Sequence, residues 1–216
     1  LGDVYKRQAL GTVLAAMQQI TGINAVINYA PVIFAQTGVG GSTALLQSAL
    51  VGLVNFLATI VAIGLVDTRG RRTLLVWGAA GMVASLSYLT ASFACNWPEA
   101  GILIGVLVYI AFFAASFAPV MWVVIGEIYP DRIRAKAMSF STAVSWVCTF
   151  LTVQFSPWIL GRFGGAALFG IFALMSLAAL LFGLREDHLA HVGDTGRLEE
   201  HVLGAAPVSY THLTLP

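Results

Sequence analysis

Charged residues are scarce in this sequence, and those present are gathered in short clusters. Only 10% of the 216 residues are Asp, Glu, Lys or Arg, whereas a soluble domain carries roughly a quarter. Residues 9–66 contain none of these and no histidine. Because unpaired polar groups are costly in hydrocarbon, long apolar runs of this kind belong in a bilayer. The sequence therefore predicts an integral membrane protein, and it lacks the basic face that nucleic-acid binding requires.

Residue types that bind metals or act as catalysts are also scarce. The two cysteines, Cys95 and Cys148, form no CxxC pair, and we interpret both as buried apolar residues. All four histidines follow residue 187, and the apolar segments contain no His, Asp or Glu. A membrane enzyme would need a nucleophile, a base or a metal site there. The sequence predicts neither an enzyme nor a cofactor.

The first apolar run does contain a group of carboxamides. Gln18, Gln19, Asn24 and Asn28 lie close together and are followed by Tyr29. At about 100° per residue, Asn24 and Asn28 share one stripe of a helix with Gln18 and Tyr29 beside it, whereas Gln19 points elsewhere unless the helix is disturbed. Carboxamides offer donors and an acceptor without net charge, which suits a neutral ligand rich in hydroxyls. A single amide would more simply join two membrane helices, but four on nearly one face favour a polar lining.

Charges and turn formers divide the chain into six apolar segments. A membrane-spanning helix needs about 20 residues, and the expected spans within a bundle at 8–184 are about 9–36, 43–66, 73–95, 100–126, 137–161 and 166–184. Gly22 and Pro31 are natural breaks in the first span. Residues 185–207 are expected to form a soluble tail. Residues 1–7 and 208–216 do not match their neighbours and are expected to be adaptor-derived, so that the native part is cut from a longer protein.

The distribution of cations predicts the orientation in the membrane. If six helices alternate, only Arg162 falls on one side, and the other side holds Arg69, Arg71, Arg72, Arg132, Arg134, Lys136 and Arg185. By the positive-inside rule the side with more cations is cytoplasmic. We therefore expect a multi-pass protein of the cell membrane with a cytoplasmic C-terminus.

Four motifs together resemble the sugar porters of the major facilitator superfamily. They are QQxxGxN at residues 18–24, DxxGRR at 67–72, PxxW at 119–122 and ExYPxxxR at 127–134. Each motif alone is weak, but all four occur in order at membrane spacing. The resemblance implies an all-α fold of six transmembrane helices, forming the C-terminal half of a twelve-helix major facilitator fold. It implies transport of a neutral monosaccharide by alternating access, through proton symport or facilitated diffusion. The expected partners are the sugar, the lipid bilayer, protons and a missing N-terminal half, without which this half would be inactive.

The same resemblance assigns sugar-binding roles to individual residues. Amides of the first span and Asn55 of the second would bond to hydroxyls, Trp122 would lie beneath the sugar ring, and two Phe side chains would wall the cavity. Asn28 stands where the family usually has Tyr or Phe, and Ser145 stands where relatives often carry Gln or Asn, which affects the choice of sugar rather than the ligand class. The full expected set is Gln18, Gln19, Asn24, Asn28, Asn55, Phe113, Phe117, Trp122, Ser145 and Trp146.

The charged loops resemble the cytoplasmic latch of the family, in which ion pairs close one side and break when it opens. The expected latch residues are Asp67, Arg71, Arg72, Glu127 and Arg134. Ion pairs near a surface are individually weak, which suits a contact that must open in every cycle. A simpler interpretation, that the charges only set topology, is preferred for Arg69 and Lys136.

A second function remains open beside transport. A membrane sugar sensor could use the same scaffold without moving its ligand. Such a sensor would favour a long signalling tail, whereas the expected tail at residues 185–207 is short.

Overall fold

The computed structural model describes residues 2–35, 41–69, 71–129 and 131–185, and within them all regular secondary structure is helical. This confirms the predicted all-α membrane class. The predicted tail beyond residue 185 lies outside the described residues, as do residues 208–216. The elements are α1 (Gly2–Ile20), α2 (Ile23–Ala35), α3 (Gly41–Arg69), α4 (Arg71–Ala94), α5 (Glu99–Phe112), the π-helical turn η1 (Phe113–Phe117), α6 (Ala118–Ile128) and α7 (Asp131–Arg185). Helix α1 begins within the residues expected to be non-native.

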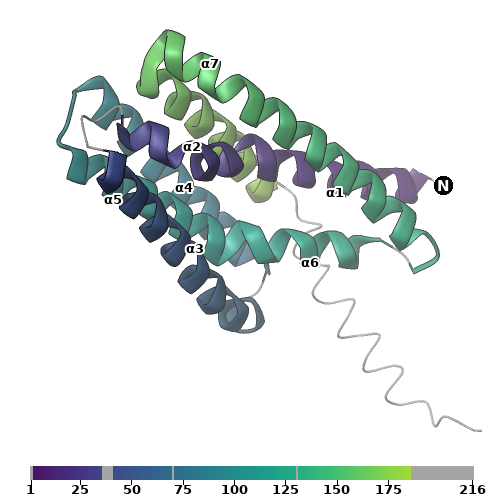
Figure 1. Cartoon of the computed structure of the whole chain (residues 1–216). Helices are drawn as coiled ribbons and strands as arrows, with labels where there is room; N and C mark the ends of the chain where they lie inside the picture. Colours follow the sequence, from purple (N-terminus) through teal and green to yellow (C-terminus); the bar gives the residue numbers. More distant parts are fainter. Residues whose placement is uncertain (1, 36–40, 70, 130, 186–216) are drawn as a thin grey trace, which may run out of the picture.

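Five helical stretches of the described chain are long and apolar enough to cross a membrane, and the last, Ile133–Arg185, has 53 residues. One straight helix of that length would measure about 80 Å, more than twice the thickness of a hydrocarbon core. Gly164 has non-helical dihedral angles, φ 80° and ψ 176°, so that α7 consists of two helices. Figure 1 shows the chain reversing there. The predicted spans 137–161 and 166–184 lie on either side of this reversal.

The first membrane segment is interrupted at Gly22. Helix α1 ends at Ile20 and α2 begins at Ile23, and Gly22 between them has a φ of 91°. A Cβ on this glycine would lie 2.5 Å from the Phe172 ring, so both conformation and space require glycine. Pro31, the other expected break, instead lies inside α2.

A second irregularity occurs in the fourth membrane segment, where η1 separates α5 from α6. Pro119 follows in the first turn of α6. Since proline has no N–H to donate and its ring crowds the preceding turn, a wider π-turn accommodates it without ending the helix. Two glycines of α4 make room for this region, because a Cβ on Gly78 would collide with Ser116 and one on Gly81 with Phe112.

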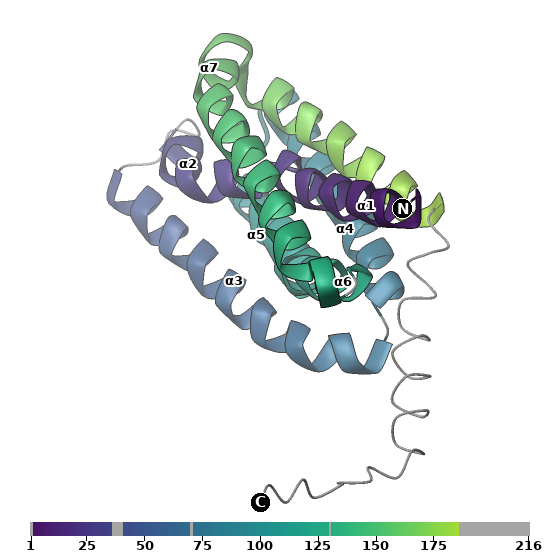
Figure 2. The same ribbon diagram turned by 90° about the vertical axis from the view of Figure 1, so that its right-hand side faces the viewer.

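The helices are unequally buried. In Figure 1 the first half of α7 passes in front of α1, whereas α4 and the second half of α7 lie behind, and Figure 2 shows the same order from the side. Side chains from α1, α2, α4, α5, η1, α6 and the second half of α7 form most of the core, and α3 contributes Val51. Helix α3 lies at one edge, and only 17% of its apolar span is buried. The interrupted helices are therefore central, and α3 is peripheral.

Candidate functional site

The amides predicted to bind sugar meet at the break between α1 and α2. The Asn24 Nδ2 donates to Gln19 Oε1 at 2.5 Å, and the Gln19 Nε2 donates to Gln18 Oε1 at 3.4 Å. The Gln18 Nε2 in turn donates to the backbone carbonyl of Phe117 in η1 at 3.2 Å. We call Gln18, Gln19 and Asn24 the amide relay. The break at Gly22 brings Gln19, which a regular helix would direct elsewhere, between the other two.

The relay leaves hydrogen-bonding capacity for a ligand. A primary amide has two N–H donors and an oxygen with two lone pairs. Each hydrogen bond of the relay uses one donor of one amide and one lone pair of its acceptor, so each amide keeps unused donors or lone pairs. Gln18 is 3% exposed, while Gln19 and Asn24 are partly exposed. The relay is therefore anchored at its buried end and accessible at the other two amides.

The interrupted backbone has its own hydrogen-bond partners. The Thr21 hydroxyl donates to the Gln18 carbonyl at 2.7 Å, and the Tyr109 hydroxyl of α5 donates to the Thr21 carbonyl at 2.9 Å. Thr21 and Tyr109 are both completely buried. Neither residue was predicted as part of the site. The available signal was that Tyr109 is the only polar side chain in residues 100–112, and a buried Tyr usually finds a partner for its hydroxyl.

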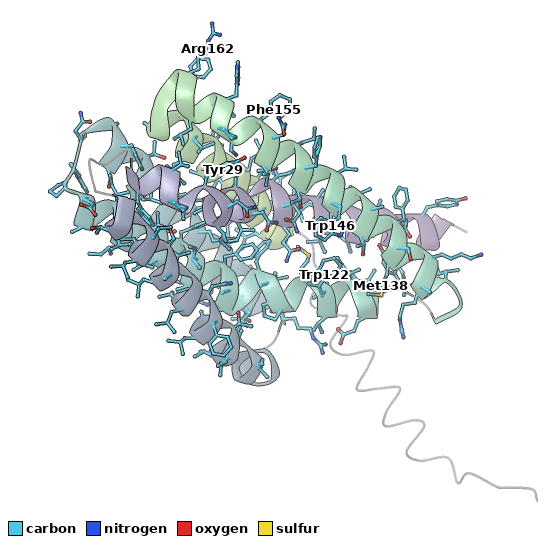
Figure 3. All side chains as sticks on the ribbon, viewed as in Figure 1. Tyr29, Trp122, Met138, Trp146, Phe155 and Arg162 are labelled. Carbon is cyan, nitrogen blue, oxygen red and sulfur yellow. The ribbon has the colours of Figure 1, made fainter. Side chains whose placement is uncertain are left out.

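The predicted aromatic residues fall into two groups. Phe113 and Phe117 are buried in η1 with ring centroids 6.3 Å apart. Trp122 is 37% exposed and Trp146 is 69% exposed. Figure 3 labels Trp122 on α6 and Trp146 on the first half of α7. The Phe pair thus belongs to η1, the turn whose Phe117 carbonyl binds Gln18. The two Trp side chains are exposed and could contact a ligand or another part of the protein.

Three predicted polar residues are not joined to the relay. Asn28 is exposed on α2, Asn55 is half-buried on α3, and Ser145 is buried on α7. Among the described residues, no hydrogen bond links any of them to the amide relay. Their roles in sugar binding remain predictions.

Charged groups meet where α4 begins and α6 ends, away from the amide relay. Arg71 at the start of α4 and Glu127 near the end of α6 form an ion pair of 2.6 Å, with 31% and 33% of their side chains exposed. The Arg134 Nε donates to the Tyr129 carbonyl at 3.2 Å. The side chains of Asp67 and Arg72, the other predicted latch residues, lie outside the described part. The structure thus provides one cross-helix ion pair at the predicted latch.

A second polar cluster, largely buried, lies near the Arg71–Glu127 pair. We call it the start cluster because it holds the N-terminal half of α1. The hydroxyls of Tyr129 and Ser141 are 2.7 Å apart, and those of Thr12 and Ser141 are 3.3 Å apart. The Tyr129 hydroxyl also donates to the Gln8 carbonyl at 3.4 Å. A shallow open hollow beside the cluster is lined by Gln8, Ile133, Lys136, Ala137 and Phe140, and none of the predicted sugar-binding residues lines it.

Neither the amide relay nor the start cluster contains a charged or thiol side chain that could bind a metal ion. Over the part of the chain that the structure describes, no three His, Cys, Asp or Glu side chains gather closely enough to hold a metal ion. The chemistry available at the amide relay is uncharged hydrogen bonding beside aromatic rings.

Comparison with known proteins gives consistent matches. Residues 2–186 match the family model described as sugar (and other) transporter. The glucose facilitated diffusion protein of Zymomonas mobilis is 44% identical over 144 residues, covering 65% of this chain and 30% of that protein. The D-xylose-proton symporter of Escherichia coli K12 is 36% identical over 179 residues, covering 80% of this chain and 36% of the symporter. The chain thus spans about a third of the length of these curated relatives.

Solved structures agree with the sequence matches. The proton:xylose symporter XylE bound to 6-bromo-6-deoxy-D-glucose superimposes with a TM-score of 0.75 at 35% identity, covering 81% of this chain and 38% of XylE. The inward open conformation of XylE from Escherichia coli gives a TM-score of 0.73 at 33% identity, with 83% and 38% covered.

Proposed function

This chain belongs to the sugar (and other) transporter family, the sugar porters of the major facilitator superfamily, and we propose that it is the C-terminal six-helix half of a porter for a neutral monosaccharide. The sugar would bind at the amide relay and cross the membrane by alternating access. The relatives act on sugars by their names, one by facilitated diffusion and one with protons. For this chain, the residues assigned to sugar binding are those of the amide relay.

The observation that carries the proposal is the amide relay across the Gly22 break. Three uncharged amides lie inside a segment that has no charged residue between positions 9 and 36, and they are tied to a neighbouring interrupted helix. Keeping such groups in a membrane is costly unless they are paired. Their spare donors and acceptors suit hydroxyl groups, and discontinuous helices near the midplane are where transporters of this kind bind substrate.

The rest of the porter would cover the exposed apolar faces of this half. Helix α3 exposes Leu53, Phe56 and Ile60, and the first half of α7 exposes Trp146 and Phe150. Lipid tails or the N-terminal half would bury such surfaces. We infer that the six-helix half alone lacks one wall of the cavity and does not transport sugar by itself. Since the six predicted spans of this chain contain no Asp, Glu or His, a coupling proton would bind outside them in the complete protein.

Orientation is a separate part of the proposal. With the Arg71–Glu127 pair on the cytoplasmic side, the turn containing Asn96 would face outward. In a full-length background with Cys95 and Cys148 replaced by Ser, Asn96→Cys should react with an impermeant thiol reagent added outside. A cysteine replacing Arg134 should not react. The reverse pattern would show that the orientation is wrong.

Sugar binding by the full-length protein that contains this chain tests the site. Removing one amide partner of a hydroxyl costs about 0.5–1.5 kcal/mol, so Gln18→Ala or Asn24→Ala should raise the sugar Kd by about threefold to tenfold. Trp122→Ala should weaken binding of different sugars by similar factors, because a ring face contacts the sugar without reading hydroxyl direction. Gln154→Ala removes an exposed amide on α7 and serves as the matched control.

Two results would contradict the proposal. If the relay variants bind sugar like the parent but unfold at lower temperature, the amides only join helices. If the parent binds sugar but vesicles containing it take up none even down a sugar gradient, the protein is a sugar sensor rather than a porter.

A further inference from the structure

The helix break beneath the amide relay is held by groups that are not part of the relay. An interrupted helix leaves backbone carbonyls without intrahelical partners. Within a bilayer, such carbonyls need partners from the protein, because no water is available. Here the Thr21 hydroxyl bonds to the Gln18 carbonyl, and the Tyr109 hydroxyl bonds to the Thr21 carbonyl. Tyr109 therefore connects α5 directly to the backbone at the break.

The break is also supported by α7. The ring of Phe172 occupies the space where a side chain on Gly22 would begin. Phe172 is 4% exposed and Tyr109 is fully buried. The dihedral angles at residues 21 and 22 are thus set by two helices, α5 and the second half of α7, that contribute no amide to the relay.

The relay depends on this backbone because it crosses the break. Gln18 and Gln19 lie on α1, Asn24 lies on α2, and the hydrogen bond between Asn24 and Gln19 joins the two helices. A small change in the direction of α2 relative to α1 would move Asn24 with respect to Gln18. The spacing of these amides determines which hydroxyl arrangement on a sugar can contact both.

We propose that Tyr109 is a positioning residue for sugar selectivity, which acts by holding the Thr21 carbonyl and so fixing the spacing of the Gln18 and Asn24 amides. This inference rests on the proposed function, since it assumes that the relay binds sugar. Tyr109 need not touch the sugar. Its hydroxyl matters because a phenyl ring would fill the same volume but leave the Thr21 carbonyl without its partner.

The chain contains a matched control for the loss of a buried tyrosine hydroxyl. Tyr129 is 1% exposed, its hydroxyl contacts Ser141, and it also bonds to α1, through the Gln8 carbonyl. Tyr129→Phe therefore also removes a tyrosine hydroxyl that bonds to a backbone carbonyl of the first membrane segment, but at a place outside the amide relay. A general loosening of α1 would appear in both variants.

The test is the ratio of the Kd values for D-glucose and D-galactose, which differ in the direction of one hydroxyl, in the full-length protein. A shift between conformations multiplies both Kd values by the same factor, so the ratio reports the site itself. Tyr109→Phe and Thr21→Val should each change this ratio about threefold or more. Thr21→Ser, which keeps the hydroxyl, and Tyr129→Phe should leave it at the parent value.

The outcomes separate this inference from the proposed function. If Tyr109→Phe folds and keeps the parent ratio while Gln18→Ala weakens binding, the positioning role is wrong and the sugar site stands. If Tyr129→Phe shifts the ratio as much as Tyr109→Phe, the effect is general loosening, and the inference is also wrong. If Gln18→Ala has no effect on either Kd, the proposed site itself fails. Should Tyr109→Phe not fold, Thr21→Val against Thr21→Ser tests the other hydrogen bond that holds the break, from the Thr21 hydroxyl to the Gln18 carbonyl. An unchanged ratio in Thr21→Val would then show that the backbone at the break does not set selectivity, and the inference would be wrong.

Discussion

Two buried tyrosines hold the first membrane segment, each by a hydrogen bond to its backbone. Tyr109 holds it where the helix is interrupted, and Tyr129 holds it where α1 is continuous. At the break, Tyr109 donates to a carbonyl that the interrupted backbone leaves free. At the start cluster, α1 is continuous and Tyr129 mainly contacts the Ser141 hydroxyl. A tyrosine hydroxyl therefore satisfies a free backbone carbonyl at the break, whereas at the start cluster it joins side chains of neighbouring elements.

The charges around the two places differ as well. The contacts at the break are uncharged, whereas Arg134 and the Arg71–Glu127 pair lie at the end that holds the start cluster. A partly exposed ion pair keeps water near its charges, and this lowers both its strength and its desolvation cost. Near the middle of a bilayer only neutral groups avoid that cost. The break is therefore built from neutral contacts alone, and the role of the charged end as a latch stays a prediction.

The largest effect should come from a side chain placed at the break itself. Gly22→Ala combines a left-handed φ with a Cβ inside the Phe172 ring. The conformational cost is about 1–2 kcal/mol and overpacking adds about 1–3 kcal/mol. We expect thermal unfolding in detergent to show a severe loss of stability. Gly126→Ala, where a Cβ meets no atom within 4 Å, is the control. Equal stability of the two variants would mean that the break is not rigid.

A smaller loss should follow from the same substitution at the start cluster. In Gly11→Ala the Cβ would lie 2.3 Å from the Tyr129 hydroxyl, but Gly11 lies within α1. Only overpacking of about 1–3 kcal/mol is expected, partly relieved by movement of the Tyr129 ring. Unfolding measurements on Gly11→Ala beside Gly22→Ala would sharpen the comparison. A larger loss at Gly11 would reverse it.

Removal of a hydroxyl from the start cluster should cost less again. Ser141→Ala takes away the closest partner of the Tyr129 hydroxyl and a partner of Thr12. Leaving a buried donor unsatisfied costs about 1–3 kcal/mol, and the remaining contact with the Gln8 carbonyl keeps the loss near the lower limit. Thermal unfolding should shift, while the sugar Kd should stay at the parent value. A changed Kd would show that the two places on α1 are coupled.

The smallest effect on stability should come from the ion pair. Glu127→Gln removes a partly exposed pair worth less than about 1 kcal/mol. If the pair latches the outward-facing state, this variant should favour the inward-open state and slow the transport cycle while the sugar Kd changes little. Uptake rates in vesicles provide the measurement, and Lys136→Gln, at an exposed position, is the control. An unchanged uptake rate would leave Glu127 as a topology signal.

Most of the fold class was predictable from local features of the sequence. Charge-free runs predict membrane helices whatever their neighbours are, and the four motifs predict the sugar porter family, which the comparisons confirm. The break at Gly22 and the reversal of α7 at Gly164 also follow from glycine, because both residues adopt a positive φ. Pro31 shows the limit of such reasoning, since it remains inside α2.

The partners of the site residues were not predictable in the same way. Gln18 bonds to a carbonyl 99 residues away, and Tyr109 bonds to one 88 residues away. Gln19 meets Asn24 because the break at Gly22 turns α2 away from the direction that a regular continuation of α1 would take. Such contacts depend on how helices pack, and in a bilayer the apolar surface of one helix differs little from that of another or from lipid. The sequence by itself determined which segments enter the membrane and which neutral groups they carry. Only the tertiary structure decided which freed carbonyl each group would satisfy, because the packing of α5 against the break brings the Tyr109 hydroxyl to the Thr21 carbonyl.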